Sequence, residues 1–194
     1  MYDEVMLISL TKIAKIFQSS TEANLNVQSF AIDSRKVQPG GIFFALKGNK
    51  TDGHHFLQDV ANKGGYAAVV KKGYQGPGYG LHLFFVDDVL QALQELARAI
   101  IKERKLRVIG VTGSVGKTTT KDMIKHILSM KYKVHASKGN FNSQAMLPIT
   151  VLEAEGDEDF LLLEMGMTKK GHIRSLVSIA PPEIVVLTPI TYCH

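Results

Sequence analysis

Residues 110–120 read GVTGSVGKTTT, and this stretch decides the fold. Residues 106–112 form a β-rich apolar run that predicts a strand, and residues 117–130 predict a helix. Glycines between a strand and a helix let backbone N–H groups turn inward toward phosphate oxygens, and the helix N-terminus adds its positive end. This context predicts a phosphate-binding loop, or P-loop.

Each part of the predicted P-loop has an expected role. Lys117 is expected to reach the β- and γ-phosphates of ATP, and the Thr118 hydroxyl to bind Mg²⁺. The loop departs from the common pattern G-x4-G-K-[ST], which requires glycine where this chain has Val111. A glycine-rich turn with a chance Gly-Lys-Thr is the alternative, but strand, glycines, lysine, hydroxyls and helix together favour nucleotide binding. The predicted nucleotide-binding residues here are Gly113, Ser114, Val115, Gly116, Lys117, Thr118 and Thr119.

Predicted strands and helices alternate on both sides of the P-loop. After the loop, the predicted strands are residues 132–136, 160–164 and 184–188, and the predicted helices between them are residues 143–153 and 171–179. Such alternation indicates βαβ units and a mostly parallel sheet. Before the loop, apolar residues share one face of a predicted helix over 88–105, which follows a compact module of shorter strands and helices. We therefore expect an α/β protein with a small mixed α/β domain over residues 1–84 and an incomplete P-loop ATPase domain over residues 85–194.

Composition excludes several classes of protein. The net charge is +5, from 23 Lys and Arg against 18 Asp and Glu, but the basic residues are scattered rather than clustered. This pattern argues against nucleic-acid binding. No apolar run approaches the roughly 18 residues of a membrane-spanning helix, and no signal peptide is evident. We expect a cytoplasmic protein that does not insert into membranes.

Several further stretches carry a family resemblance. They are GNFNSQAMLP at 139–148, EMGM at 164–167 and TPITYCH at 188–194. Together with the loop TGSVGKTTTK, they resemble the Mur ligase family. DSRKVQPGGIFFALKG at 33–48 and DGHHF at 52–56 resemble that family's UDP-sugar-binding domain. Within the family, the EMGM segment and the loop favour the member that adds D-Ala-D-Ala over members that add single amino acids.

The resemblance implies a reaction and its reactants. ATP, with Mg²⁺, would phosphorylate the terminal carboxylate of UDP-MurNAc-tripeptide, and the amine of D-Ala-D-Ala would attack the acyl phosphate. The resemblance also implies a third, C-terminal domain, so we expect this chain to be inactive as a ligase on its own. We expect a monomer. The alternatives are a ligase of the same superfamily that adds a single amino acid, and a P-loop nucleotide-binding module that joins nothing.

The resemblance extends to residues outside the P-loop. Glu164 ends an apolar strand, where open parallel sheets place their ligand sites, and a carboxylate suits magnesium. His194 matches a metal-associated histidine of the family, although Pro189 stands where the family has asparagine. Asn140 is expected near the nucleotide and Asn142 near the substrate, with a turn and helix cap as the alternative, which is favoured for Asn142. The predicted catalytic residues are Lys117, Glu164 and His194, and the predicted metal ligands are Thr118, Glu164 and His194.

Two short segments of the first domain are candidates for binding the UDP-sugar. Ser34 and Arg35 follow a predicted strand, and Arg35 is expected to pair with the diphosphate. A surface arginine in a solvated turn is the equal alternative. Asp52, Gly53 and His54 form a predicted tight turn, whose carboxylate and imidazole are expected to hold the UDP-sugar.

Overall fold

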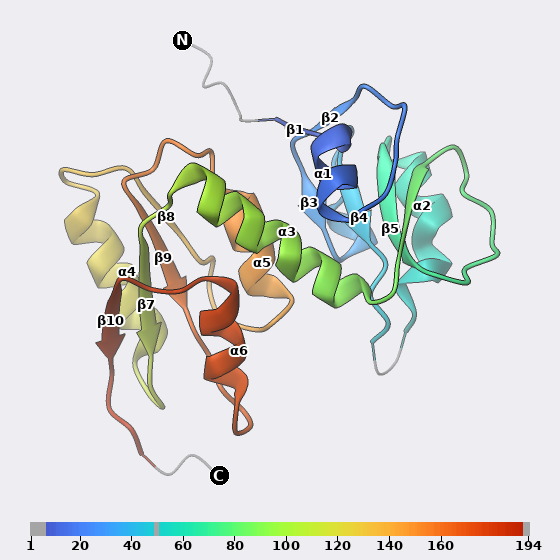
Figure 1. The fold of residues 1–194 in the computed structure, drawn as a ribbon. Helices are drawn as coiled ribbons and strands as arrows, with labels where there is room; N and C mark the ends of the chain where they lie inside the picture. The colour runs from blue at the N-terminus through green and yellow to red at the C-terminus, as the bar shows by residue number, and fades with distance from the viewer. Residues whose placement is uncertain (1–6, 49–50, 192–194) are drawn as a thin grey trace. The chain divides into compact units, whose positions relative to one another are not determined.

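The chain divides into two compact units, Met1–Leu96 and Ala97–His194, each with its own four-stranded parallel sheet (Figure 1). The computed structural model describes residues 7–48 and 51–191. The division falls within helix α3 (Val89–Arg104). It lies further along the chain than the boundary proposed between residues 84 and 85. A boundary there would cut strand β6 (His82–Val86), which pairs along its whole length inside the first unit.

The sheet of the first unit has short helices packed on one of its faces. In spatial order its strands are β3 (Phe30–Ala31), β4 (Ile42–Phe44), β5 (Ala67–Lys71) and β6. Residues 42–44 and 67–70 are all buried, which accounts for their unbroken apolar character, because inner parallel strands face a core on both sides. The short helices η1 (Ser34–Lys36) and α2 (Leu57–Asn62) pack on this core through Val37, Leu57 and Val60.

Three small elements complete the first unit. Helix α1 (Leu10–Ile16) begins after Ser9, whose hydroxyl accepts a hydrogen bond from Lys12 N at 3.2 Å. Strands β1 (Ile8–Ser9) and β2 (Asn26–Val27) pair antiparallel and were not predicted from the sequence. Their two-residue length is the reason, since an alternating pattern needs about four residues to be visible.

The sheet of the second unit confirms the predicted α/β fold with a parallel sheet. In spatial order its strands are β10 (Ile184–Leu187), β7 (Val108–Thr112), β9 (Phe160–Glu164) and β8 (Val134–Ala136). All three pairings are parallel. The two inner strands are β7 and β9, and all five residues of β9 are buried. The carboxyl ends of β7 and β9 therefore lie side by side, which is where open parallel sheets place their ligand sites.

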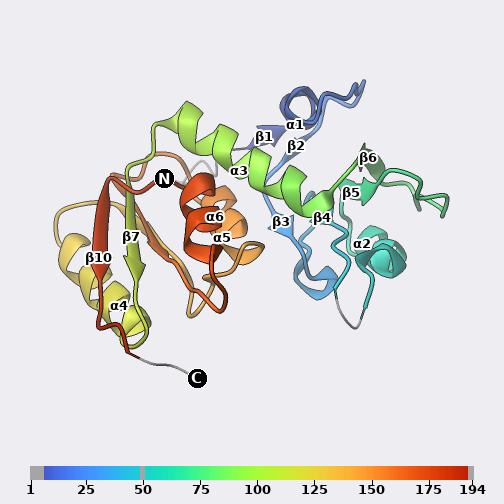
Figure 2. The same cartoon turned by 60° about the horizontal axis from the view of Figure 1, so that its bottom comes forward.

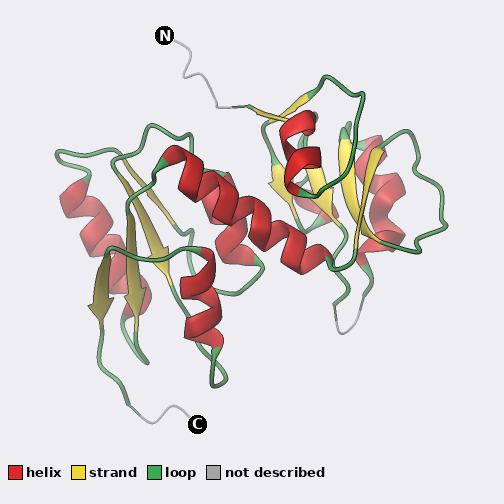
Figure 3. Ribbon diagram, in the orientation of Figure 1, coloured by secondary structure: helices red, strands yellow, loops and turns green. Residues whose placement is uncertain are grey.

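Helices cover both faces of this second sheet (Figures 2 and 3). Side chains of β9 alternate between the faces: Leu161 and Leu163 join one core, and Phe160 and Leu162 join the other. Helix α4 (Lys117–Leu128) packs on the second of these cores. The first is covered by residues of α3 beyond position 96 and by α5 (Met146–Leu152) and α6 (His172–Ile179). Across the described residues, no helix is both long and apolar enough to cross a membrane.

Candidate nucleotide and metal site

The P-loop joins the end of β7 to the start of α4 and needs glycine at two places. Gly113 and Gly116 have φ of 141° and 82°, in the region that L side chains rarely adopt. A Cβ on Gly113 would lie only 2.6 Å from the carbonyl oxygen of Thr188, so the segment after β10 excludes any side chain there. Ser114 N also donates a hydrogen bond to Pro189 O at 3.0 Å. The loop is therefore shaped by a segment far away in the sequence.

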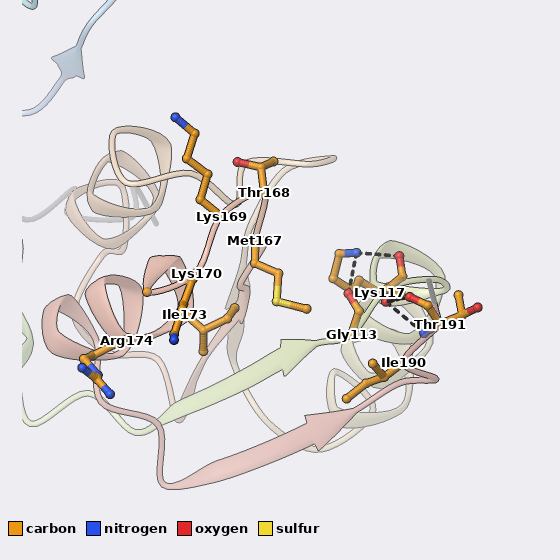
Figure 4. A pocket seen from close by; sticks show the side chains of 12 residues that line it. Gly113, Lys117, Met167, Thr168, Lys169, Lys170, Ile173, Arg174, Ile190 and Thr191 are labelled. Atoms are coloured by element: carbon orange, nitrogen blue, oxygen red, sulfur yellow. Dashed lines mark hydrogen bonds between the residues drawn. The ribbon is translucent and has the colours of Figure 1, made fainter. Parts of the chain in front are cut away.

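Lys117 is the first residue of α4, and its ammonium lies over the P-loop. Its Nζ donates hydrogen bonds to Gly113 O at 2.8 Å and Ser114 O at 3.1 Å (Figure 4). A cation held over a glycine-rich loop at a helix N-terminus suits the phosphates of a nucleotide. Because both contacts are to loop carbonyls, an arriving phosphate would compete for the ammonium without any ion pair having to break.

Glu164 is the last residue of β9 and lies beside the start of the P-loop. The strand register pairs it with Val111 of β7. The residue is only 1% exposed, yet its carboxylate is surrounded by neutral donors. Thr118 Oγ1 donates to Oε2 at 2.7 Å, and Asn142 Nδ2 donates to Oε1 at 2.8 Å. Its own backbone N–H donates to Ser137 Oγ at 3.1 Å. A buried carboxylate is costly without such partners, so the arrangement is built to hold it.

The pair formed by Thr118 and Glu164 fits a magnesium ion. Both side chains offer oxygen, the ligand atom that this hard cation prefers, and their oxygens are already 2.7 Å apart. Thr118 belongs to the first turn of α4, so a cation between the two would adjoin phosphates bound by the P-loop. The third predicted ligand, His194, lies outside the described residues. All three metal-ligand assignments remain predictions.

The two asparagines predicted near this site are placed differently. Asn140 is exposed, whereas the half-buried Asn142 contacts Glu164. Asn142 was interpreted as part of a turn and helix cap; its N–H does donate to Asn140 O at 2.7 Å, but its side chain donates to Glu164 rather than to the start of α5, which follows Ala145. Gly166 leaves room for the Asn142 side chain, since a Cβ on this glycine would lie 2.7 Å from Asn142 Cγ. What either asparagine binds remains a prediction.

A cavity of about 550 Å³ opens beside Lys117. The P-loop forms one side, and the segment from Met167 to Arg174, after β9, forms another. Met167 extends toward the P-loop, whereas Lys169 points away from it (Figure 4). No role was predicted for residues 168–174, although the adjacent Lys169 and Lys170 follow EMGM after a single threonine.

In the first unit, Arg35 is engaged by Asp33. Its Nε and a terminal nitrogen donate to the two carboxylate oxygens at 2.9 and 2.8 Å, and its backbone N–H donates to Asp33 Oδ1 at 3.0 Å. Arg35 is 85% exposed, whereas Ser34 is buried. A diphosphate at Arg35 would have to share or displace this ion pair, and binding by either residue remains a prediction.

The hydrogen bond from Arg35 holds the pKa of Asp33 at about 2, below its ordinary value of 3.8. Because the folded-state pKa is lowered, this contact stabilises the protein above about pH 4, and the stabilisation is lost as the pH falls toward 2. We expect Arg35→Gln to raise the pKa of Asp33 toward 3.8, measured by carboxyl carbon NMR through a pH titration. Lys36→Gln is the control and should move the Asp33 pKa much less, because Lys36 lowers it only through a weak Coulombic attraction. An unchanged pKa in Arg35→Gln would contradict the assignment.

The turn at residues 52–54 is tied into the first unit by its own side chains. The Asp52 carboxylate accepts from His54 N at 3.0 Å and lies 2.6 Å from His54 Nδ1, while His54 Nε2 accepts from Lys71 N at 3.0 Å. Both ring nitrogens are thus used, which assigns the tautomer with hydrogen on Nδ1. Gly53 lies against Ala45, where a Cβ would be 2.8 Å from the Ala45 Cα. The turn has a clear packing role, and its contact with a UDP-sugar remains a prediction.

The P-loop, the buried carboxylate beside it and the cavity between the P-loop and residues 167–174 are features of the P-loop class of nucleotide-binding proteins. Two protein-family models match the chain: "Mur ligase family, catalytic domain" over residues 26–101 and "Mur ligase middle domain" over residues 111–194. The chain belongs to the Mur ligase family, as its motifs predicted.

Within the family, the chain is similar to the following individual proteins. The chain is 42% identical over 168 residues to a UDP-N-acetylmuramoyl-tripeptide–D-alanyl-D-alanine ligase of Bacillus subtilis. The aligned region covers 87% of this chain and 37% of that protein. The chain resembles a crystal structure of MurF from Acinetobacter baumannii with a TM-score of 0.88 at 27% identity, covering 98% of the chain and 42% of that protein. MurF from Thermotoga maritima in complex with ADP gives 0.73 at 35% identity, covering 83% and 37%. The chain thus spans about two fifths of the length of these relatives.

Proposed function

We propose that this chain supplies the UDP-sugar-binding and ATP-binding parts of a ligase that joins D-Ala-D-Ala to UDP-MurNAc-tripeptide. The observation that carries the proposal is the convergence of Lys117, Thr118 and Glu164 at the carboxyl ends of two adjacent parallel strands, beside a cavity. The Bacillus subtilis relative, whose name states this reaction, supports the choice of substrates. The Thermotoga maritima relative in complex with ADP supports the choice of nucleotide.

The proposed chemistry makes an amide in two steps. A carboxylate oxygen of the tripeptide attacks the γ-phosphorus of ATP, and the bond to the bridging oxygen breaks to release ADP. The amine of D-Ala-D-Ala then attacks the acyl carbon, loses a proton, and expels inorganic phosphate. Both steps require close positioning and neutralisation of charge on the transferred phosphoryl group.

The described residues divide this work between them. Lys117 neutralises the β- and γ-phosphates, and the P-loop amides orient them. Thr118 and Glu164 would hold Mg²⁺, which would supply further positive charge to neutralise the triphosphate. Lys170 and Arg174 contribute two cationic groups to the cavity lining, so that side of the site favours an anionic substrate such as the peptide carboxylate.

The first unit would bind the UDP-sugar. Arg35 is its best candidate, because it is exposed and Asp33 engages only Nε and one terminal nitrogen, so the other terminal nitrogen can donate to a phosphate oxygen. The carboxylate and imidazole of the 52–54 turn are occupied with each other and with the backbone, so we assign that turn to shaping the unit. The monomeric state and cytoplasmic location stay predictions.

The proposal is tested with two preparations. Isothermal titration calorimetry should detect UDP-MurNAc-tripeptide binding to the 194-residue chain. A chimera in which this chain replaces the matching residues of the Bacillus subtilis ligase should release ADP only when both UDP-MurNAc-tripeptide and D-Ala-D-Ala are present. ADP release that does not depend on D-Ala-D-Ala would overturn the assigned amine substrate. Absence of UDP-MurNAc-tripeptide binding would overturn the assigned carboxylate substrate.

A further inference from the structure

Lys121 is a buried cation with no role in the chemistry described above. It lies on α4 one turn after Lys117, and it is only 1% exposed. Burying an ammonium is unfavourable unless its donors are satisfied. Its Nζ donates to Ser137 O at 2.5 Å and Gly139 O at 3.2 Å, and it lies 3.1 Å from Asp122 Oδ1. Two of its three partners are thus backbone carbonyls of a single loop.

That loop connects β8 to α5 and carries two of the contacts that hold Glu164. Ser137 accepts the Glu164 N–H through its hydroxyl at 3.1 Å. Asn142, at the other end of the loop, donates to Glu164 Oε1 at 2.8 Å. Lys121 therefore holds the loop backbone at Ser137, the first point of contact with Glu164, and at Gly139, which lies between Ser137 and Asn142.

The contacts form a hydrogen-bond network that joins three elements. Helix α4 contributes Thr118, which donates to Glu164 Oε2, and Lys121, which lies on the same helical face three residues later. The loop at 137–142 contributes Ser137 and Asn142, and β9 contributes Glu164. Fixing the loop against α4 fixes the carboxylate from both sides, so that Oε1 and Oε2 are each aimed by a separate donor.

We propose that Lys121 is a positioning residue for the magnesium site: it fastens the 137–142 loop to the P-loop helix, so that Asn142 and Ser137 hold Glu164 in the orientation that shares a cation with Thr118. The inference rests on the proposed function, because it assigns Lys121 to the metal site of that reaction. Residues that orient a metal ligand commonly change metal affinity by about 10- to 100-fold when they are removed.

The test separates metal-dependent from metal-independent nucleotide binding. Affinity for a non-hydrolysable ATP analogue is measured by calorimetry on the 194-residue chain, once with Mg²⁺ and once with EDTA. We expect Lys121→Met to weaken binding in Mg²⁺ by about tenfold or more and to leave binding in EDTA unchanged. Lys121→Arg, which keeps donors at the same place, should recover part of the loss.

A matched control and a second variant keep the result interpretable. Lys125→Met removes an exposed lysine one turn further along α4 and should change neither affinity. Asn142→Ala removes the hydrogen bond from the loop to the Glu164 carboxylate and should reproduce the Mg²⁺-specific loss of affinity without altering the buried ammonium. If Lys121 acts through the loop, the double variant should lose little more than either single variant.

Each outcome has one meaning. Equal weakening of Lys121→Met with Mg²⁺ and with EDTA would indicate a general structural role and overturn the inference. Asn142→Ala with wild-type Mg²⁺ dependence would overturn the route through the loop, even if Lys121→Met did not fold. A wild-type chain that binds no nucleotide under either condition would instead count against the proposed function.

Discussion

Replacing Glu164 by glutamine is expected to abolish the Mg²⁺-dependent gain in ATP affinity. Glutamine keeps the size of the side chain and one oxygen acceptor, but it loses the charge that makes a carboxylate a magnesium ligand. In EDTA the variant should bind the ATP analogue as well as the wild type or better, because a negative charge near the triphosphate has been removed. Calorimetry in Mg²⁺ and in EDTA gives both values.

The same substitution should leave stability intact. In the protein without metal, the buried Glu164 carboxylate accepts hydrogen bonds from Thr118 and Asn142, and both of these described partners are neutral. Exchange for an uncharged group of the same shape should therefore not lower the midpoint of thermal unfolding, and binding residues are often held at some cost to stability. Glu153→Gln, in the exposed ion pair with Lys138, is the control and should leave Mg²⁺ dependence unchanged. A Glu164→Gln chain with full Mg²⁺ dependence would remove Glu164 from the metal site.

Much of the fold could be predicted because buried strands and helices have recognisable patterns of apolar residues. All five residues of β9 are buried, and its run FLLLE predicts an inner parallel strand that ends in a carboxylate. The carboxyl ends of neighbouring parallel strands meet at one edge, so the meeting of Glu164 with the P-loop also followed from the order of the elements.

Details of the site could not be predicted because they depend on residues far apart in the chain. The need for glycine at 113 comes from Thr188, and no local spacing reveals that approach. Whether Asn140 or Asn142 faces the site could not be decided from a turn-forming sequence, because two positions along the loop separate an exposed side chain from one that reaches Glu164.

Binding residues and packing residues can also share one sequence signature. DGHHF has the side chains of a ligand-binding turn, yet Asp52 and His54 satisfy each other and the backbone of β5. Lys121 is the opposite case. As one of three lysines in α4 it would be predicted to be a solvated surface residue, and only its burial against Ser137 and Gly139 indicates a specific role.

Replacing Lys117 by alanine is expected to weaken ATP binding both with and without Mg²⁺. The ammonium is free to exchange two loop carbonyls for phosphate oxygens, and a hydrogen bond to a charged partner contributes about 1.5 to 3 kcal/mol. That range corresponds to roughly a 10- to 150-fold loss of affinity. Calorimetry with the non-hydrolysable analogue measures it, and the loss should be of similar size in EDTA because the lysine acts on the phosphates directly.

This dependence distinguishes Lys117 from the metal site around Glu164. Lys117→Ala should lower the affinity for the ATP analogue in Mg²⁺ and in EDTA, whereas Glu164→Gln should lower only the affinity measured in Mg²⁺. The two variants therefore separate the contribution of the lysine from that of the metal ion. Lys125→Ala, an exposed lysine two turns further along α4, is the control for a general loss of positive charge and should have little effect. Wild-type affinity in Lys117→Ala would mean that the ammonium stays with Gly113 and Ser114 when nucleotide binds. The P-loop amides and the α4 N-terminus would then carry phosphate recognition alone, and Lys117 would act only on the phosphoryl group during its transfer.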